Sequence, residues 1–314
     1  MRFQGSKSRF RSEKRLCCSD LPTERSAQTS TQIRRRIDWL PALLLLPLLI
    51  LFIGWYIAPL LSTFVNSFHP FRLNGIRYSE WTLSNYTELL TDGYYRGIIL
   101  RTFLIAVAVA LASVIAVYPV AIFIERQVLT VQTYLILIYL TPWLVNVTVK
   151  AFGWTLLLGP GGIINHSLLS LGLIAHPLKL MFNELGIFIG LFHAQFVFVL
   201  LPVWAALRGI DSNIIYAASN LGAGPLTILW RVTIPLTLPA LTAGLIISMT
   251  MSLSAFATPA LLGGGRARVL SYLSYHINLV QLNWPLGAAA GVFLLALTFL
   301  PILILRALGR SRIT

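Results

Sequence analysis

Long apolar runs separated by short polar segments dominate the chain after residue 38. A helix rises 1.5 Å per residue, so about 20 apolar residues cross a hydrocarbon core of roughly 30 Å. Runs of that length predict six transmembrane helices, over 39–61, 98–124, 131–158, 185–207, 236–262 and 286–308. The pattern therefore predicts an all-α polytopic membrane protein.

The composition agrees with this prediction. Hydrophobic residues make up 57% of the 314 positions and charged residues only 11%, and a soluble domain could not bury that much apolar surface. The formal net charge of +14 would indicate nucleic acid as the partner of a soluble protein. Here the basic residues gather near the N-terminus and between the apolar runs, as membrane topology requires. We therefore expect a lipid bilayer, and no nucleic acid, around this chain.

Residues 1–38 carry ten Lys or Arg and no long apolar run. They predict a basic, disordered tail ahead of a membrane domain over 39–314. Cys17 and Cys18 are the only cysteines; they are adjacent in this tail and cannot supply a four-ligand zinc site. We expect neither a metal nor a cofactor. Basic residues are denser before the first span than after it, which predicts that the N-terminus and, after six crossings, the C-terminus are cytoplasmic.

The polar segment between the predicted fourth and fifth spans, 208–235, is patterned to fold outside the membrane. Asp211 is suited to cap a helix, and that helix would carry apolar residues on one face: Ile214, Ala217, Ala218 and Leu221. Gly222 would end it, because glycine tolerates the left-handed backbone common at helix C-termini. Gly224 and Pro225 would begin a second short helix. The segment is thus predicted to be a bent pair of helices on the cytoplasmic side.

The spacing within this segment resembles the Glu-Ala-Ala loop of the membrane subunits of ABC importers. The matching positions are Ala217, Ala218, Leu221, Gly222, Ile234 and Pro235. Tyr216 stands where the family has glutamate, which is a departure from its pattern. In that family the loop forms coupling helices that sit in a groove of a cytoplasmic ATPase. The resemblance implies the same role for 208–235.

Three further stretches resemble the spermidine/putrescine branch of these permeases. The first contains Pro142-Trp143, then Lys150 at a basic position before an aromatic-x-Trp, then glycines and Asn165. The others are FATPALLGG at 256–264 and NWPLGAA at 283–289. The resemblance covers most of the chain after residue 80 and implies the type I importer permease fold.

This resemblance implies a permease subunit rather than an enzyme. It would move a small solute, polyamine-like or another small organic solute, across the bacterial inner membrane. The implied partners are cytoplasmic ATP-binding subunits, a second homologous permease subunit and a periplasmic or extracellular solute-binding protein. The chain has no Gly-x-x-x-x-Gly-Lys-[Ser/Thr] loop of its own to bind ATP. The alternative is a secondary transporter or channel that works alone, which would need paired ionisable groups or an inverted repeat.

Polar residues inside the predicted spans are candidates for lining the translocation path: Trp143, Asn146, Lys150, Ser252 and Thr258. An ammonium group in an apolar run must face a polar cavity, reach an interface or find a partner, so Lys150 fits either a path or a membrane edge. Small residues recurring on one face of the fifth span fit either close packing or a path. We also expect Pro259 and the glycines at 263–265 to break that span.

Overall fold

The computed structural model describes residues 39–72, 75–76 and 80–310. The predicted tail 1–38, with Cys17 and Cys18, lies outside the described residues. The chain divides into two units, Met1–Leu51 and Phe52–Thr314. The described part of the first unit, from Trp39 to Leu51, is helical and belongs to α1 (Trp39–Phe52). The remainder of the description concerns the second unit.

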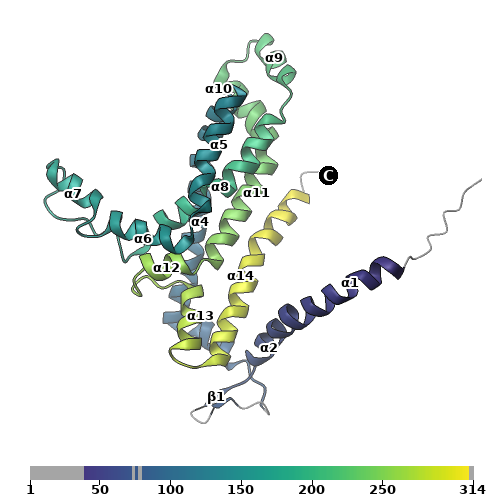
Figure 1. Ribbon diagram of the computed structural model, residues 1–314, viewed down its shortest axis with the longest axis vertical. Helices are drawn as coiled ribbons and strands as arrows, with labels where there is room; N and C mark the ends of the chain where they lie inside the picture. The colour runs from purple at the N-terminus through teal and green to yellow at the C-terminus, as the bar shows by residue number, and fades with distance from the viewer. Residues whose placement is uncertain (1–38, 73–74, 77–79, 311–314) are drawn as a thin grey trace, which may run out of the picture. The chain divides into compact units, whose positions relative to one another are not determined.

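Helices form nearly all of the second unit (Figure 1). In chain order they are η1 (Ile53–Ile57), α2 (Ala58–Asn66), α3 (Ser84–Thr91), α4 (Gly93–Glu125), α5 (Leu129–Leu144), α6 (Val147–Leu158), α7 (Ile163–Ser170), α8 (Glu184–Arg208), α9 (Ser212–Asn220), α10 (Pro225–Ile228), η2 (Leu229–Thr233), α11 (Ile234–Ser254), α12 (Ala257–Leu262), α13 (Leu270–Leu279) and α14 (Trp284–Arg310). Strands β1 (Phe71–Arg72) and β2 (Gly75–Ile76) pair as an antiparallel hairpin.

Six stretches of the described chain are helical, long and apolar enough to cross a membrane, which confirms the predicted number of spans. They are Leu45–Asn66, Gly93–Glu125, Val147–Ser170, Glu184–Arg208, Pro225–Ser254 and Trp284–Leu303. Helix α5, with 16 residues, is a shorter apolar helix beside them.

Helices α4, α8 and α11 pack on one another and form the centre of the bundle (Figure 1). Val117 and Ala121 of α4 are fully buried against Val199 of α8. Gly244 brings α11 close to α8, since a Cβ added there would lie 3.0 Å from Cγ1 of Val199. Small residues at such crossings let helix backbones approach, and dispersion contacts then hold the helices together within a bilayer.

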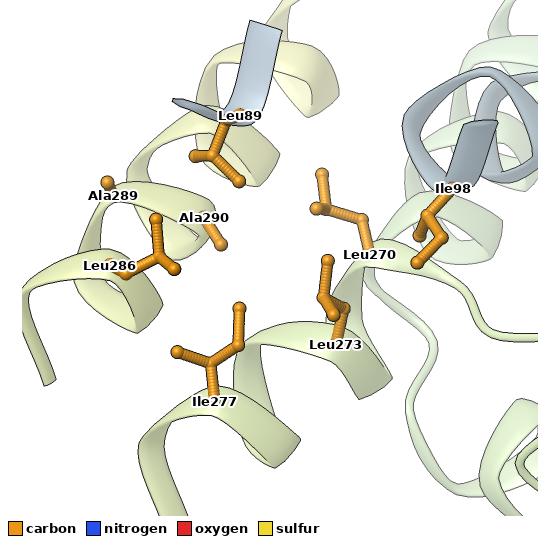
Figure 2. Close-up of a cluster of buried hydrophobic side chains, with 8 residues drawn as sticks. All are labelled: Leu89, Ile98, Leu270, Leu273, Ile277, Leu286, Ala289 and Ala290. Carbon is orange, nitrogen blue, oxygen red and sulfur yellow. The ribbon is translucent and has the colours of Figure 1, made fainter. Parts of the chain in front are cut away.

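A second apolar core joins the opposite end of α4 to α3, α13 and α14 (Figure 2). Its buried members are Leu89, Ile98, Leu270, Leu273, Ile277, Leu286, Ala289 and Ala290. Figure 2 shows the side chains from these helices converging on one region. This core fixes the connection between α12 and α13 against the start of α4.

A π-helical turn precedes two of the prolines. Turn η1 lies before Pro59, and η2 lies before Pro235. Proline has no N–H to donate, and its ring crowds the carbonyl four residues earlier, so a wider turn at that point relieves the crowding. The helix continues through both sites, as prolines in membrane helices permit.

The predicted third span, 131–158, is not one helix. Val145 and Asn146 adopt extended backbone angles and separate α5 from α6, and Figure 1 shows α6 turning away from the line of α5. The Asn146 side chain accepts a hydrogen bond from the N–H of Thr148 at 2.8 Å. An asparagine that caps a helix N-terminus favours a new start at that position, and the hydrophobic run concealed it.

The predicted fifth span, 236–262, is also divided, but earlier than expected. The helix stops after Ser254 and restarts at Ala257, so the break lies at Ala255–Phe256 and not at Pro259. Pro259 is the third residue of α12, where no intrahelical N–H partner is required. The glycines at 263–265 end α12 instead.

Candidate functional site

The segment between α8 and α11 has the predicted bent shape. Oδ1 of Asp211 accepts a hydrogen bond from the N–H of Asn213 at 2.9 Å and caps α9. Gly222 has φ of +82° and follows the end of that helix. Pro225 then begins α10. Sequence reasoning missed one feature: α10 does not stand alone, because η2 joins it to α11 as a continuous helix.

Helix α9 lies outside the core, and its apolar side chains are uncovered. Tyr216 is 64% exposed and Leu221 is 89% exposed. Ala217 is exposed and Ala218 is half-buried. At the start of α11, Ile234 is half-buried and Pro235 is exposed. In Figure 1, α9 projects from the end of the bundle beyond α10. An apolar face left in this state outside a bilayer is typical of a docking surface.

The base of this segment faces the ends of α4 and α8. A cavity of about 240 Å³ separates it from the end of α4, with Glu125 on one wall and Ile215 and Pro225 on the other. Nε2 of Gln132 donates hydrogen bonds to the carbonyls of Glu125 and Gln127, at 3.0 and 2.8 Å, and ties α5 to the end of α4. The Arg208 guanidinium lies over the Trp204 ring, 5.4 Å from its centroid.

Three of the proposed path residues surround the break between α5 and α6. Trp143 is half-exposed and packs edge-to-face on Phe198 of α8. Asn146 is exposed at the break, where it serves as the cap described above. Lys150 is half-buried one turn into α6 and lies near His193 of α8. His193 is itself fixed by Trp154, whose Nε1 donates to Nδ1 of His193 at 3.4 Å.

Ser252 and Thr258 are buried between helices. The hydroxyls of Ser248 and Ser252 on α11 lie 2.7 and 2.8 Å from the side-chain amide of Gln195 on α8. With its NH₂ group turned toward α11, Gln195 donates to the Ser248 carbonyl and accepts from the Ser252 N–H. Thr258 on α12 packs on Gly190, where an added Cβ would lie 2.6 Å from its methyl group. The structure therefore favours helix packing for this pair.

Ser252→Ala is accordingly expected to lower the free energy of unfolding by about 0.6–1.7 kcal/mol, the range for hydrogen bonds between membrane helices. Uptake should change by less than about twofold, which is equivalent to roughly 0.4 kcal/mol. Reversible unfolding in a bilayer mimic and an uptake assay measure the two quantities. Ser254→Ala is the matched control, since Ser254 is exposed and bonds only within its own helix, to Thr250 and Met251. A large loss of uptake with unchanged stability would contradict packing as the role of Ser252.

Sequence reasoning missed a group of arginines at the other end of α4. Two neighbouring cavities there are lined by Arg101 of α4 and by Arg266 and Arg268 of the α12–α13 connection. The only signal in the sequence is a pair of basic residues after three consecutive glycines. Arg101 forms an ion pair with Glu184, with Nε 2.7 Å from Oε1.

Comparison with known proteins places these features in a family. Residues 128–314 match the family described as "Binding-protein-dependent transport system inner membrane component". The spermidine/putrescine transport system permease protein PotB of Escherichia coli strain K12 is 30% identical over 214 residues, covering 68% of this chain and 78% of the relative. The permease UgpA of the sn-glycerol-3-phosphate transport system of Yersinia pestis is 29% identical over 286 residues, covering 83% and 90%.

The fold is similar to that of a solved bacterial transporter chain. A crystal structure of the bacterial alginate ABC transporter, in complex with an alginate-bound periplasmic protein, contains a chain that aligns with a TM-score of 0.73 at 19% identity. The alignment covers 88% of this chain and 95% of that one. The match over 128–314 exceeds half of the chain and agrees with six apolar helices. The chain therefore belongs to the inner membrane components of binding-protein-dependent transport systems and is an ABC importer permease subunit.

Proposed function

We propose that this permease subunit moves a small organic solute, of polyamine type, into the cell, and that a partner subunit hydrolyses the ATP. The similarity to the PotB proteins supports the solute class. The assignment of ATP hydrolysis to a partner rests on the uncovered apolar residues of α9 and on Leu221 directly after it, which is 89% exposed. Such a face needs a partner outside the membrane to cover it.

The proposed assembly contains four kinds of component. Two cytoplasmic ATP-binding subunits would cover the segment 208–235, a second homologous permease subunit would pair with this one, and a solute-binding protein would dock at the opposite end. The separation of the two ends supports this division, because α4 runs for 33 residues, about 50 Å, between them. We place both termini, and the 1–38 tail, on the side of the ATP-binding subunits.

The proposed contact with the ATP-binding subunit consists of Tyr216, Ala217, Ala218, Leu221 and Gly222. The small side chains of the two alanines allow close approach, and Leu221 supplies apolar area at the tip. Ile234 and Pro235 join this contact to α11. Lys150 and Trp143 remain our candidates for the path, because they lie beside the break between α5 and α6 and are not enclosed by a neighbouring helix.

Cysteine labelling tests the orientation on which this proposal depends. In a variant in which Cys17 and Cys18 are replaced by serine, Asn220→Cys should react with a membrane-impermeant maleimide only from the cytoplasmic face. Ser170→Cys at the end of α7 is the matched control and should react only from outside, because both residues are exposed and the proposed topology puts them on opposite sides of the membrane. Labelling of Asn220→Cys from outside alone would refute the proposed coupling role.

A further inference from the structure

Three arginines come together at the end of the bundle opposite α9. Arg101, Arg266 and Arg268, here called the arginine cluster, line two cavities of about 480 and 460 Å³. Arg101 and Arg266 line both. In Figure 1 the α12 and α13 region that carries Arg266 and Arg268 lies far along the bundle from α9 and α10.

Positive charge at the cluster exceeds negative charge. Glu184 is the only acidic residue among those lining the two cavities, and it is paired with Arg101. Among the described residues, Arg268 bonds to neutral oxygens alone, the Gly265 carbonyl at 3.0 Å and the Tyr94 hydroxyl at 2.5 Å. The Arg266 side chain is exposed and forms no hydrogen bond or ion pair within the described residues, its backbone N–H alone donating to the Gly263 carbonyl at 3.1 Å. Two guanidinium charges therefore remain available to an anionic partner.

The backbone that carries the cluster is held in one conformation. Gly264 and Gly265 have φ of +55° and +72°, a left-handed turn that side chains rarely adopt. The Phe182 ring covers Gly264, and the Phe182 N–H donates to the Leu262 carbonyl at 2.8 Å. At the other end of the connection, the N–H of Leu270 donates to Oγ1 of Thr102 at 2.8 Å.

The same connection rests on the apolar core of Figure 2, which contains Leu270 and Leu273. Arg268 is fixed further by its two hydrogen bonds across to α4 and back to its own turn. A side chain ordered in this way loses little entropy when a partner binds, so Arg268 is preorganised for association, on a backbone that also carries Arg266.

The exposure of the cluster favours a protein as its partner. Ion pairs between exposed groups contribute little free energy, so they would bind a free small carboxylate only weakly. A protein surface excludes water from the contact and adds apolar area around it. Tyr94 and Phe182 supply that area, being 49% and 44% exposed beside the arginines. Arginine with exposed aromatic residues is the composition typical of interface hot spots.

We infer that the arginine cluster binds carboxylate side chains on the surface of the solute-binding protein. This inference rests on the proposed function, which places this end of the bundle outside the cell. Guanidinium groups pair with carboxylates in bidentate geometry. Charge complementarity of this kind steers the encounter of two proteins and sets their relative orientation.

Association kinetics test the inference in the complete transporter, reconstituted in nanodiscs with its second permease and ATP-binding subunits. The probe is the solute-binding protein that stimulates ATP hydrolysis by that transporter. Arg266→Glu should reduce its association rate about tenfold at low salt, and the difference should shrink as salt screens the charges. Arg266→Lys should recover most of the rate. Arg96→Glu is the control, because Arg96 is an exposed arginine of the same end that lines neither cavity.

The outcomes separate the inference from the proposed function. If the unaltered transporter binds its solute-binding protein but Arg266→Glu leaves the association rate and its salt dependence unchanged, the inference is wrong. The inference is equally wrong if Arg96→Glu slows association as much as Arg266→Glu does. If no solute-binding protein binds or stimulates the unaltered transporter, the proposed function fails, and the inference falls with it.

Discussion

Gly222→Asp is expected to lower solute uptake at least about tenfold, equivalent to roughly 1.4 kcal/mol, while membrane insertion stays normal. Gly222 has φ of +82°, and a side chain in that conformation costs about 1–2 kcal/mol. No atom lies within 4 Å of an added Cβ, so the subunit itself accommodates the new side chain. The carboxylate would instead project toward the partner surface. Uptake, together with the amount of protein in the membrane, measures the effect.

Gly172→Asp is the matched control for this variant. Gly172 has φ of +68° and equally open surroundings, but it follows α7, on the other side of the membrane in our proposal. The same backbone strain and the same charge are therefore introduced away from the coupling segment. Normal uptake by Gly222→Asp, or an equal loss in Gly172→Asp, would contradict the proposed role of α9 and its glycine.

Asn165→Asp is expected to destabilise the connection between α6 and α8 by about 2–4 kcal/mol, as breaking a buried hydrogen-bond network does. Asn165 is fully buried. Its Nδ2 donates to the carbonyls of Gly159 and Leu178, each at 3.0 Å, and its Oδ1 accepts from the N–H of Leu178 at 2.8 Å. Aspartate keeps the shape, but its carboxylate cannot donate to the two carbonyls and would lie against them.

Protease cleavage of the 171–183 loop measures this effect, since local opening sets the cleavage rate when reclosing is fast. A change of 2–4 kcal/mol corresponds to roughly 30- to 1,000-fold faster cleavage. Asn220→Asp is the control, because Asn220 is exposed and its side chain has no hydrogen bond within the described chain. Equal cleavage rates for Asn165→Asp and the unaltered protein would show that this asparagine does not fix the loop.

The sequence allowed the local features of this protein to be predicted well. Runs of apolar residues predicted six spans, and Asp211, Gly222 and Pro225 predicted where the helices of segment 208–235 begin and end. Each of those features depends on neighbours within a few residues. Caps and turns of this kind act through local backbone geometry, so the amino-acid order carries them directly.

Features that depend on distant contacts could not be predicted in the same way. The break at Val145–Asn146 is instead a local cap that the hydrophobic pattern concealed, because the flanking residues are apolar on both sides. The approach of Arg268 to Tyr94 joins residues 174 positions apart. The meeting of Gln195 with Ser248 and Ser252 likewise depends on how α8 crosses α11. Each of these contacts follows from the way the helices pack, and the spacing of apolar residues along the sequence does not specify that packing.

The continuity of α10, η2 and α11 makes the second arm of segment 208–235 one continuous helical rod. The rod extends over the 30 residues from Pro225 to Ser254, about 45 Å. A displacement applied at Pro225 would travel its full length before meeting a joint, and that joint is the extended residue Ala255. Helix α12 lies directly beyond it and contacts α6, which carries Lys150. A movement of α10 at one membrane face would thus be transmitted to α12 and to the helix that carries that lysine.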